Sequence, residues 1–404
     1  MTETCDIAII GGGPVGAALA LALRDSNLKI CVLEARSENA VSKDARALAL
    51  SYGSRLLLAR LGLWDTLQDV SPIRTIHISQ KQSFGRTLLH AEELNVPELG
   101  YVLPYSTLQD ALQNALSPSP SPASGRGVRD SAGEGRGKLL YLSSASVSQL
   151  KCESGHAVIN YQHDGVAQTL LTRLAVVADG GKLLAQQYPP KVHDYGQSAL
   201  ITHIACTAPK SKTAFERFTP QGPLALLPFR DGYELVWTAP HQRTQEMLAW
   251  DDAKFLHELQ MHFGDRVGNF LTVGKRASFP LGLRRAPSAT PMPHTVLLGN
   301  AAQTMHPVAG QGFNMGLRDA WELAQEILDA KPEELGTEAM LAAYRSHRRV
   351  DREMGIRFTD GLVKLFSNDL PLVSAARAAV LTALDCLPFA KKFVAKRMMF
   401  GANG

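Results

Sequence analysis

Two glycine-rich turns, almost a whole chain apart, constrain the fold of this sequence more than any other feature. The first spans residues 11–16 (G-G-G-P-V-G), between a short apolar run at 6–10 and a helical pattern at 17–24. The second spans residues 299–316 (G-N-A-A-Q-T-M-H-P-V-A-G-Q-G-F-N-M-G), also between an apolar run and a helical pattern. Free amides at such helix starts can face an anion or an electron-rich ring. The two turns together predict one elongated cofactor held at both ends.

The N-terminal turn has the G-x-G-x-x-G spacing of a dinucleotide-binding unit. Gly11 permits the tight turn, Gly13 lets the backbone approach a pyrophosphate, and Gly16 lets the helix pack on the strand. Pro14 and Val15 lie between these glycines, at a helix start that faces the phosphates. We therefore expect all five residues to bind the cofactor.

An acidic residue closes the next predicted strand. Glu34 follows the apolar run 30–33, at the distance from the turn that dinucleotide binding requires, and is expected to accept hydrogen bonds from ribose hydroxyls. Ala35 and Arg36 are expected beside it in the same site. A purely structural glycine turn is the alternative, which this order of strand, turn, helix, strand and glutamate disfavours.

Three further segments carry a family resemblance. They are residues 44–54 (D-A-R-A-L-A-L-S-Y-G-S), residues 61–64 (L-G-L-W) and Asp179-Gly180, which ends an apolar run. With the two glycine turns, they resemble the class A flavoprotein aromatic hydroxylases, and within them the ubiquinone-biosynthesis hydroxylases. The resemblance runs from about residue 5 to the C-terminus, interrupted mainly by one insertion.

The second turn narrows the resemblance. Residues 300–307 (N-A-A-Q-T-M-H-P) are most similar to the 2-polyprenyl-6-methoxyphenol hydroxylase branch. Most members of the wider family have Gly-Asp where this chain has Gly299-Asn300, and a histidine where it has Gln303. An asparagine still hydrogen-bonds hydroxyls but lacks the negative charge, so this departure puts flavin affinity in question.

The resemblance implies an α/β fold in which a Rossmann-like FAD-binding domain of the p-hydroxybenzoate hydroxylase type is interleaved with a mixed β-sheet substrate domain and followed by C-terminal helices. Alternating strands such as 224–228 and 233–238 agree with it. The expected FAD-binding domain comprises residues 1–70, 104–182 and 272–350, the substrate domain 71–103 and 183–271, and the helical region 351–404.

The insertion covers residues 117–138, between a helix that should end near Leu116 and a strand that should begin near Leu139. Its Ser, Pro, Gly and Arg content offers almost nothing to bury, so we expect a disordered surface loop. A tether for an acidic partner is the weaker alternative.

Composition excludes several classes of protein. The net charge of +4 does not suggest nucleic-acid binding, and five scattered cysteines without C-x-x-C argue against a disulfide framework, a metal site or a dithiol centre. The apolar residues 7–23 have no basic segment before them, so we expect no targeting segment and a cytoplasmic enzyme. No second nucleotide-binding motif occurs, which fits a reductant that docks transiently and disfavours the pyridine-nucleotide disulfide reductases. The four tryptophans lack the signature of the flavin halogenases.

The implied chemistry assigns roles to the second turn. The family hydroxylates phenols with FAD, NAD(P)H and dioxygen through a flavin hydroperoxide, and its proteins contribute positioning and electrostatics. The helix that begins near Gly312 should point at the flavin pyrimidine edge. His306 and Pro307 are the expected catalytic-loop residues, although a structural role for His306 is equally compatible with the sequence. The expected flavin contacts from this turn are Gly299, Asn300, Pro307, Gly310, Gln311, Gly312, Phe313 and Asn314.

Two further residues complete the expected site. Arg46 is expected to flank the pyrophosphate, with surface solvation as the alternative. The family's Asp-Gly turn at Asp179 is linked to both flavin and nicotinamide nucleotide, but the following residues 181–184 depart from the usual pattern.

Three interpretations of function remain. The leading one is hydroxylation of 2-polyprenyl-6-methoxyphenol to the 1,4-benzoquinol in ubiquinone biosynthesis, the second a related hydroxylase of another ring position or substrate, and the third a non-catalytic flavoprotein scaffold. The expected partners are a polyprenylated phenol, dioxygen, and the inner membrane surface or a ubiquinone-biosynthesis complex. A basic, amphipathic C-terminal pattern agrees with peripheral membrane contact, with core packing as the alternative; its cations are Lys391, Lys392, Lys396 and Arg397.

Overall fold

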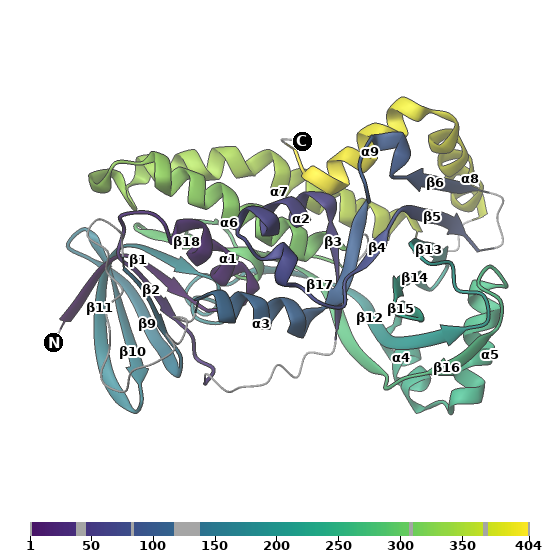
Figure 1. Cartoon of the computed structure of the whole chain (residues 1–404), viewed down its shortest axis with the longest axis horizontal. Helices are drawn as coiled ribbons and strands as arrows, with labels where there is room; N and C mark the ends of the chain where they lie inside the picture. Colours follow the sequence, from purple (N-terminus) through teal and green to yellow (C-terminus); the bar gives the residue numbers. More distant parts are fainter. Residues whose placement is uncertain are drawn as a thin grey trace.

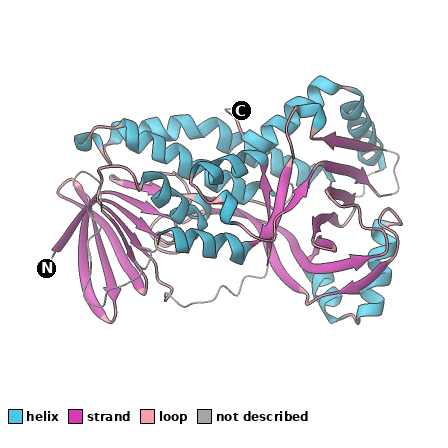
Figure 2. Ribbon diagram, viewed as in Figure 1, coloured by secondary structure: helices cyan, strands magenta, loops and turns pink. Residues whose placement is uncertain are grey.

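The computed structural model describes residues 2–37, 46–81, 85–116, 138–306, 310–366 and 371–402. The expected insertion, apart from its last residue, and the expected catalytic Pro307 lie outside the described residues. Two large sheets occupy opposite ends of the long axis, and helices cover the region between them (Figures 1 and 2).

One sheet carries the predicted dinucleotide-binding turn. Within the described residues it has seven strands, in the order β8-β2-β1-β11-β10-β9, with β18 also paired to β11. The strands β8, β2, β1, β11 and β18 are parallel, and β9 and β10 extend the sheet as an antiparallel hairpin. Their bounds are β1 (Thr2–Ile10), β2 (Ile30–Leu33), β8 (Leu139–Leu142), β9 (Ala145–Glu153), β10 (His156–His163), β11 (Val166–Val177) and β18 (Thr295–Leu297).

The parallel strands are apolar on both faces because both faces are covered. Ile7 and Ile9 of β1 face the helices, whereas Ala8 and Ile10 face the side covered by the β9–β10 hairpin. The helices that contribute to the first core are α1 (Pro14–Leu23), α2 (Tyr52–Arg60), α3 (Tyr105–Leu116) and α6 (Gln311–Asp329). Four loops of the predicted site, at residues 11, 34, 179 and 299, therefore leave the carboxyl ends of neighbouring parallel strands at one edge of the sheet.

The second large sheet is mixed and has nine strands among the described residues. Its strands are β5 (Thr75–Gln80), β6 (Arg86–His90), β12 (Lys191–Cys206), β13 (Thr213–Thr219), β14 (Gly222–Phe229), β15 (Gly232–Pro240), β16 (Phe270–Val273), β17 (Ala277–Arg285) and β19 (Gln303–Thr304). The helices α4 (His241–Ala249) and α5 (Asp252–Phe263) pack against it around the fully buried Trp237 and Phe255. A small sheet of β3 (Ala47–Ser51), β4 (Ser71–Ile73) and β7 (Gly100–Pro104) completes the strands.

Three of the expected domain boundaries fall inside single elements of the structure. The boundary at 271/272 falls inside β16, the one at 103/104 inside β7, and the one at 350/351 inside the continuous helix α7 (Glu338–Phe366). Residues 277–285 were expected in the FAD-binding domain, but β17 pairs along β12 in the second sheet. The reason is that strand pairing is set by partners distant in sequence, which local patterns do not identify. The division into two domains stays a prediction.

A buried charge network fixes α7 on α6. Arg348 of α7 is 1% exposed and contacts Asp319 of α6 at 2.7 Å and Asp351 at 2.8 Å. Asp351 in turn pairs with Arg318 at 3.0 Å and accepts a hydrogen bond from the backbone amide of Ala402 at 3.0 Å. The network thus ties the end of the chain, beyond α8 (Pro371–Cys386) and α9 (Pro388–Phe400), to the helices over the first sheet.

This network predicts a large stability effect at one of two adjacent arginines. Arg348→Ala would leave the buried carboxylates Asp319 and Asp351 short of a counter-charge, so the free energy of unfolding should fall by about 3–5 kcal/mol. The matched variant Arg349→Ala removes an exposed arginine and should change the free energy of unfolding by less than about 0.5 kcal/mol. Urea denaturation of both variants measures the difference, and equal losses would contradict the assignment.

Candidate active site

The first glycine turn leaves room for a ligand at one position only. A Cβ on Gly11 would lie 2.6 Å from the carbonyl oxygen of Ala178, and a Cβ on Gly16 would collide with the carbonyl oxygen of Gly11. These two glycines are required by the close packing of strand, turn and helix. A Cβ on Gly13 would meet nothing within 4 Å, although this residue caps the start of α1. The open space beside Gly13 fits a phosphate group at the helix N-terminus.

Val15 joins the two glycine turns. A Cβ on Gly299 would lie 3.2 Å from the Cγ atoms of Val15, and a Cβ on Gly316 would lie 2.9 Å from Val15 Cγ2. The two glycines themselves are neighbours, since the built Cβ of Gly316 is 3.5 Å from the Cα of Gly299. The first turn of α1 therefore packs into the second glycine turn, and turns almost 300 residues apart form one surface.

Glu34 is buried at this sheet edge and is already bonded. Its carboxylate accepts hydrogen bonds from the amide of Gly12 at 2.7 Å, the amide of Arg36 at 2.9 Å and Arg36 Nε at 2.9 Å. Burial alone favours the neutral acid, but these bonds outweigh it and lower the pKa of Glu34. The carboxylate is thus ionised at neutral pH and has lone pairs left for a hydroxyl. Ala35 follows it in the same turn.

The structure adds two residues of α3, Gln109 and Tyr105, that the sequence did not indicate. Gln109 of α3 is 1% exposed, and its Nε2 donates to the carbonyl oxygen of Gly12 at 3.2 Å. Its Oε1 accepts a hydrogen bond from Tyr105 at 3.3 Å. α3 follows β7 rather than a strand of the first sheet, so nothing in its local sequence points to the turn. A buried glutamine on an otherwise apolar helix face was the one available signal.

Asp179 organises its own turn. Its carboxylate accepts hydrogen bonds from the backbone amides of Gly181 at 2.8 Å, Lys182 at 3.0 Å and Leu183 at 2.6 Å. Arg284 of β17 donates to the carbonyl oxygens of Gly180, at 3.3 Å, and of Gly181. The turn is therefore held against the second sheet at the same edge as the two glycine turns, although the residues after Asp179 depart from the family pattern.

The start of α6 is crowded at Gly310 and open at Gly312. Gly310 has a φ of +61° and a Cβ there would lie 3.1 Å from Ala49 Cβ, so a glycine is required. A Cβ on Gly312 would meet nothing within 4 Å. Phe313 packs on the first core, and Gln311 Nε2 donates to the carbonyl oxygen of Met398 at 3.2 Å. Gly13 and Gly312 are thus open at this edge, one at each helix start.

The side chain of Asn314 is fully hydrogen-bonded within the protein. Its Oδ1 accepts from the amide of Ser51 at 2.8 Å and from Ser54 Oγ at 2.7 Å, and its Nδ2 donates to the carbonyl oxygens of Ala49 and Gly310. These bonds use the hydrogen-bonding capacity of the amide. A cofactor contact by this residue would therefore come from its backbone. Asn300, by contrast, is exposed at the sheet edge.

His306 lies in the second glycine turn and is buried. Its ring is 1% exposed and meets the ring of Tyr195 edge-on, with centroids 5.5 Å apart. Tyr195 Oη donates to Asp360 of α7 at 3.1 Å. Burial lowers the pKa of His306 to about 4, so the imidazole is neutral at neutral pH. Tyr195 is thereby brought beside the loop expected to be catalytic.

Arg46 reaches the second sheet. Its guanidinium lies over the ring of Phe279 in β17, 5.2 Å from the centroid, while its backbone carbonyl accepts from the amide of Tyr105. Arg46 therefore lies where β3 begins, between the two sheets, and it is exposed. The sheet edge as a whole gathers two open helix starts, an ionised buried glutamate and an exposed arginine. Such a surface can hold an extended, anionic dinucleotide.

Known proteins are similar to this sequence over most of its length. A family model described as "FAD binding domain" matches residues 4–358. The uncharacterized protein slr1300 of Synechocystis is 32% identical and aligns over 99% of this chain and 94% of its own length. The ubiquinone hydroxylase UbiL of Rhodospirillum rubrum is 31% identical (98% and 90%), and the 3-demethoxyubiquinol 3-hydroxylase of Escherichia coli is 30% identical (94% and 96%).

A solved structure agrees with the fold. The p-nitrophenol 4-monooxygenase PnpA of Pseudomonas putida superposes with a TM-score of 0.75 at 16% identity, over 100% of this chain and 99% of that one. The predicted α/β fold of the p-hydroxybenzoate hydroxylase type is thereby confirmed. The chain belongs to the FAD-binding monooxygenase family, is related within it to the ubiquinone hydroxylases, and is an FAD-dependent monooxygenase with NAD(P)H as its reductant.

Proposed function

We propose that this enzyme hydroxylates the ring of a polyprenylated phenol in ubiquinone biosynthesis, converting 2-polyprenyl-6-methoxyphenol to the 1,4-benzoquinol with NAD(P)H and dioxygen. The observation that carries the proposal is the joining of the two glycine turns by Val15, which places Gly13 and Gly312 on one surface. Two relatives that align over nearly the whole chain are a ubiquinone hydroxylase and a demethoxyubiquinol hydroxylase, which supports the substrate class.

The residues at the sheet edge would hold FAD in an extended form. Gly13 and the start of α1 would receive the pyrophosphate with Arg46 beside it, Glu34 would accept ribose hydroxyls, and the amides near Gly312 would face the isoalloxazine ring. When bound, FAD accepts a hydride from NAD(P)H and, once reduced, activates dioxygen for transfer of one oxygen atom to the phenol ring. The helix N-terminus at Gly312 favours negative charge on the reduced ring.

His306 and Tyr195 would shape the reacting end of this site. The neutral imidazole of His306 can accept a hydrogen bond or a proton but adds no positive charge. Tyr195 fixes the ring of His306 edge-on and is itself held by Asp360. Burial, and then the Asp360 carboxylate, raise the pKa of Tyr195, so its hydroxyl keeps its proton at neutral pH. His306 and Tyr195 would therefore form an uncharged surface, poor in water, beside the isoalloxazine ring.

A product-mass experiment tests the proposed reaction. FAD-loaded protein, NAD(P)H, isotopically labelled dioxygen and a short-chain 2-prenyl-6-methoxyphenol should give a product heavier by one labelled oxygen atom. Fragmentation of the product should place the new hydroxyl para to the existing one. A hydroxyl at another carbon would favour the second interpretation, which the demethoxyubiquinol hydroxylase relative supports. Flavin reduction without oxygen incorporation would reject hydroxylation of this substrate.

Two glycine variants connect this reaction with the site. Gly13→Val and Gly361→Val both place a side chain where the structure has open space, so both should fold. Only Gly13→Val fills the space assigned to the pyrophosphate, and its bound FAD and product yield should fall about tenfold or more, as expected when a charge-assisted contact is lost. Flavin absorbance and product yield of the two proteins give the comparison. Full FAD occupancy in Gly13→Val would exclude the assigned position.

The pKa of His306 makes folding stability depend on pH. The folded state keeps the imidazole neutral down to about pH 4, whereas an unfolded histidine takes up a proton near pH 6.5. The unfolded state binds more protons in that window, so stability is lost as the pH falls through it. His306→Gln should lose less stability than the parent between about pH 7 and about pH 5, by about 2 kcal/mol.

Urea titrations at the two pH values measure this difference. His257→Gln, at an exposed histidine of α5, serves as the control and should behave like the parent protein. If His306→Gln showed the parent's pH dependence, the imidazole would not be neutral in the folded state.

The C-terminal helices supply the proposed membrane contact. Phe389 and Phe393 of α9 are 85% and 49% exposed and lie one turn apart, with the exposed Lys392 and Lys396 on the same side. Lys391, expected with these cations, is instead buried and pairs with Glu93 at 2.9 Å, because it lies on the face of α9 that packs on the protein. Across the described residues, no helix combines the length and apolar character needed to cross a bilayer.

A surface with exposed aromatic rings and lysines fits an anionic lipid interface. Such a contact would place the enzyme peripherally at the inner membrane, where a polyprenyl chain resides. In vesicle flotation with anionic lipids, the double variant Phe389→Ser and Phe393→Ser should bind several-fold less than the parent, since it loses the two exposed rings that would insert into the lipid. Met261→Ser, at a methionine of α5 that is 64% exposed, should bind normally. No flotation of the parent protein would reject the contact.

A further inference from the structure

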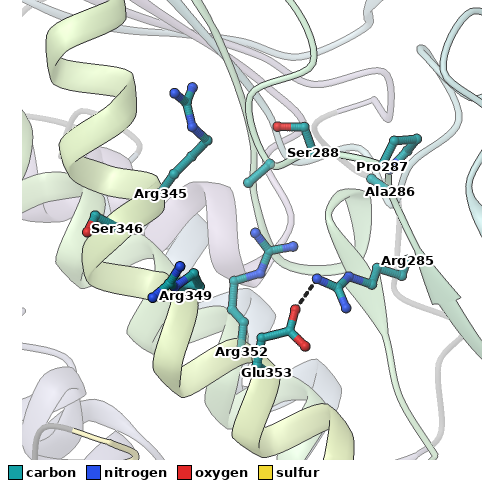
Figure 3. A pocket seen from close by; sticks show the side chains of 10 residues that line it. Arg285, Ala286, Pro287, Ser288, Arg345, Ser346, Arg349, Arg352 and Glu353 are labelled. Carbon is teal, nitrogen blue, oxygen red and sulfur yellow. Dashed lines mark hydrogen bonds and ion pairs between the residues drawn. The ribbon is translucent and has the colours of Figure 1, made fainter.

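A pocket of about 440 Å³ lies between α7 and the segment that follows β17 (Figure 3). α7 contributes Arg345, Arg349 and Arg352, which share one helix face because their spacing is four and three residues. Arg285, the last residue of β17, lines the opposite side. Four guanidinium groups therefore border one hollow outside the candidate active site.

The pocket faces away from the flavin edge of β17. Arg284, one residue earlier in the same strand, bonds to the turn after Asp179. Neighbouring residues of a strand point to opposite faces, so Arg285 lies on the other side. The pocket is close to the second glycine turn without being part of its open surface, because Arg352 Nε donates to Gln303 Oε1 at 2.7 Å.

The carboxylates at the pocket do not balance its arginines. Glu353 pairs with Arg285, and Glu338 with Arg345, whose Nη1 also donates to Thr290 Oγ1 at 2.6 Å. Arg352 is bonded to a neutral amide. In the described part of the chain, neither Arg349 nor Arg352 has a carboxylate within ion-pair distance. Two cations thus remain without an anion on the same wall.

The remaining lining residues match an anionic ligand of small-molecule size. Ser288 and Ser346 bring hydroxyl groups to the pocket, and Ala286, Pro287 and Ala289 give it an apolar end. The volume is larger than one phosphate needs and lies within the range of small-molecule sites. The planar guanidinium fork matches phosphate oxygens in two-point hydrogen bonding, which makes arginine clusters suited to phosphate.

We propose that this pocket binds a small molecule that carries a diphosphate group. Arg349 and Arg352 contact the anion from α7, and the Ser346 hydroxyl donates to its oxygens. Arg285 and Arg345, each already paired with a glutamate, flank it on the two sides. Two ligands present this group. One is free diphosphate, and the other is a nucleoside diphosphate whose base covers Pro287 and Ala289.

Calorimetric titration of the full-length protein with inorganic pyrophosphate tests the site. We expect one binding site per chain, and an affinity that falls as salt is added because the ligand is recognised by charge. Arg349→Gln should weaken binding about tenfold or more, since it removes one charge-assisted contact. Arg357→Gln removes the same charge from an exposed position of the same helix and should change affinity less than about threefold.

A second titration with ADP separates the two sources. Tighter binding of ADP than of pyrophosphate would assign the site to a nucleotide, and tighter binding of pyrophosphate to a free diphosphate. Absence of pyrophosphate and ADP binding at low salt would overturn the proposal, as would equal weakening in Arg349→Gln and Arg357→Gln. Both variants alter surface arginines, so unchanged thermal melting curves would show that the comparison is made between folded proteins.

Discussion

The packing of Val15 against Gly299 and Gly316 is the contact on which the rest of the site depends. This close packing is possible because both glycines lack a Cβ. A Cβ on Gly299 or Gly316 would lie closer to the valine methyl groups than van der Waals contact allows. The parallel order of β1, β11 and β18 brings the two turns to the same edge of one sheet before this contact is made. A helix start suited to an anion and a helix start suited to a flavin ring are thereby held at a fixed separation.

The buried network around Arg348 stabilises the second glycine turn through α6. Gln303 donates to Asp319 at 3.4 Å and accepts from Arg352, so it connects the second glycine turn, to which it belongs, with the network. The hydrogen bonds of Gln303 therefore give a structural reason for glutamine at the position where the family usually has histidine. An uncharged amide can donate to Asp319 and accept from Arg352 at once, which suits a site already crowded with charge. The arginine pocket shares Arg352 with this network and lies on its outer side.

Much of the site could be predicted from the sequence because its signals are local. A strand that ends in a glycine turn and a helix start, and a glutamate after the second strand, are properties of short segments. The strand Ile30–Leu33 has the predicted bounds, and α3 ends at Leu116 as predicted. Gln109 and Tyr195 could not be assigned in this way. Each reaches the site from an element whose partner lies about 100 residues away, and only packing shows which turn it meets.

The sequence by itself determined the two glycine turns and, through the family resemblance that they carry, the FAD-dependent class of enzyme, because glycine spacing and helix starts encode backbone shape directly. The tertiary structure decided which residues are free to act. It assigned the Asn314 side chain to Ser51 and Ser54, made His306 neutral by burial, buried Lys391 among protein contacts and placed β17 in the second sheet. It also gathered four arginines around one hollow. Charge, burial and partners are set by contacts between distant segments, and those contacts exist only once the chain has folded.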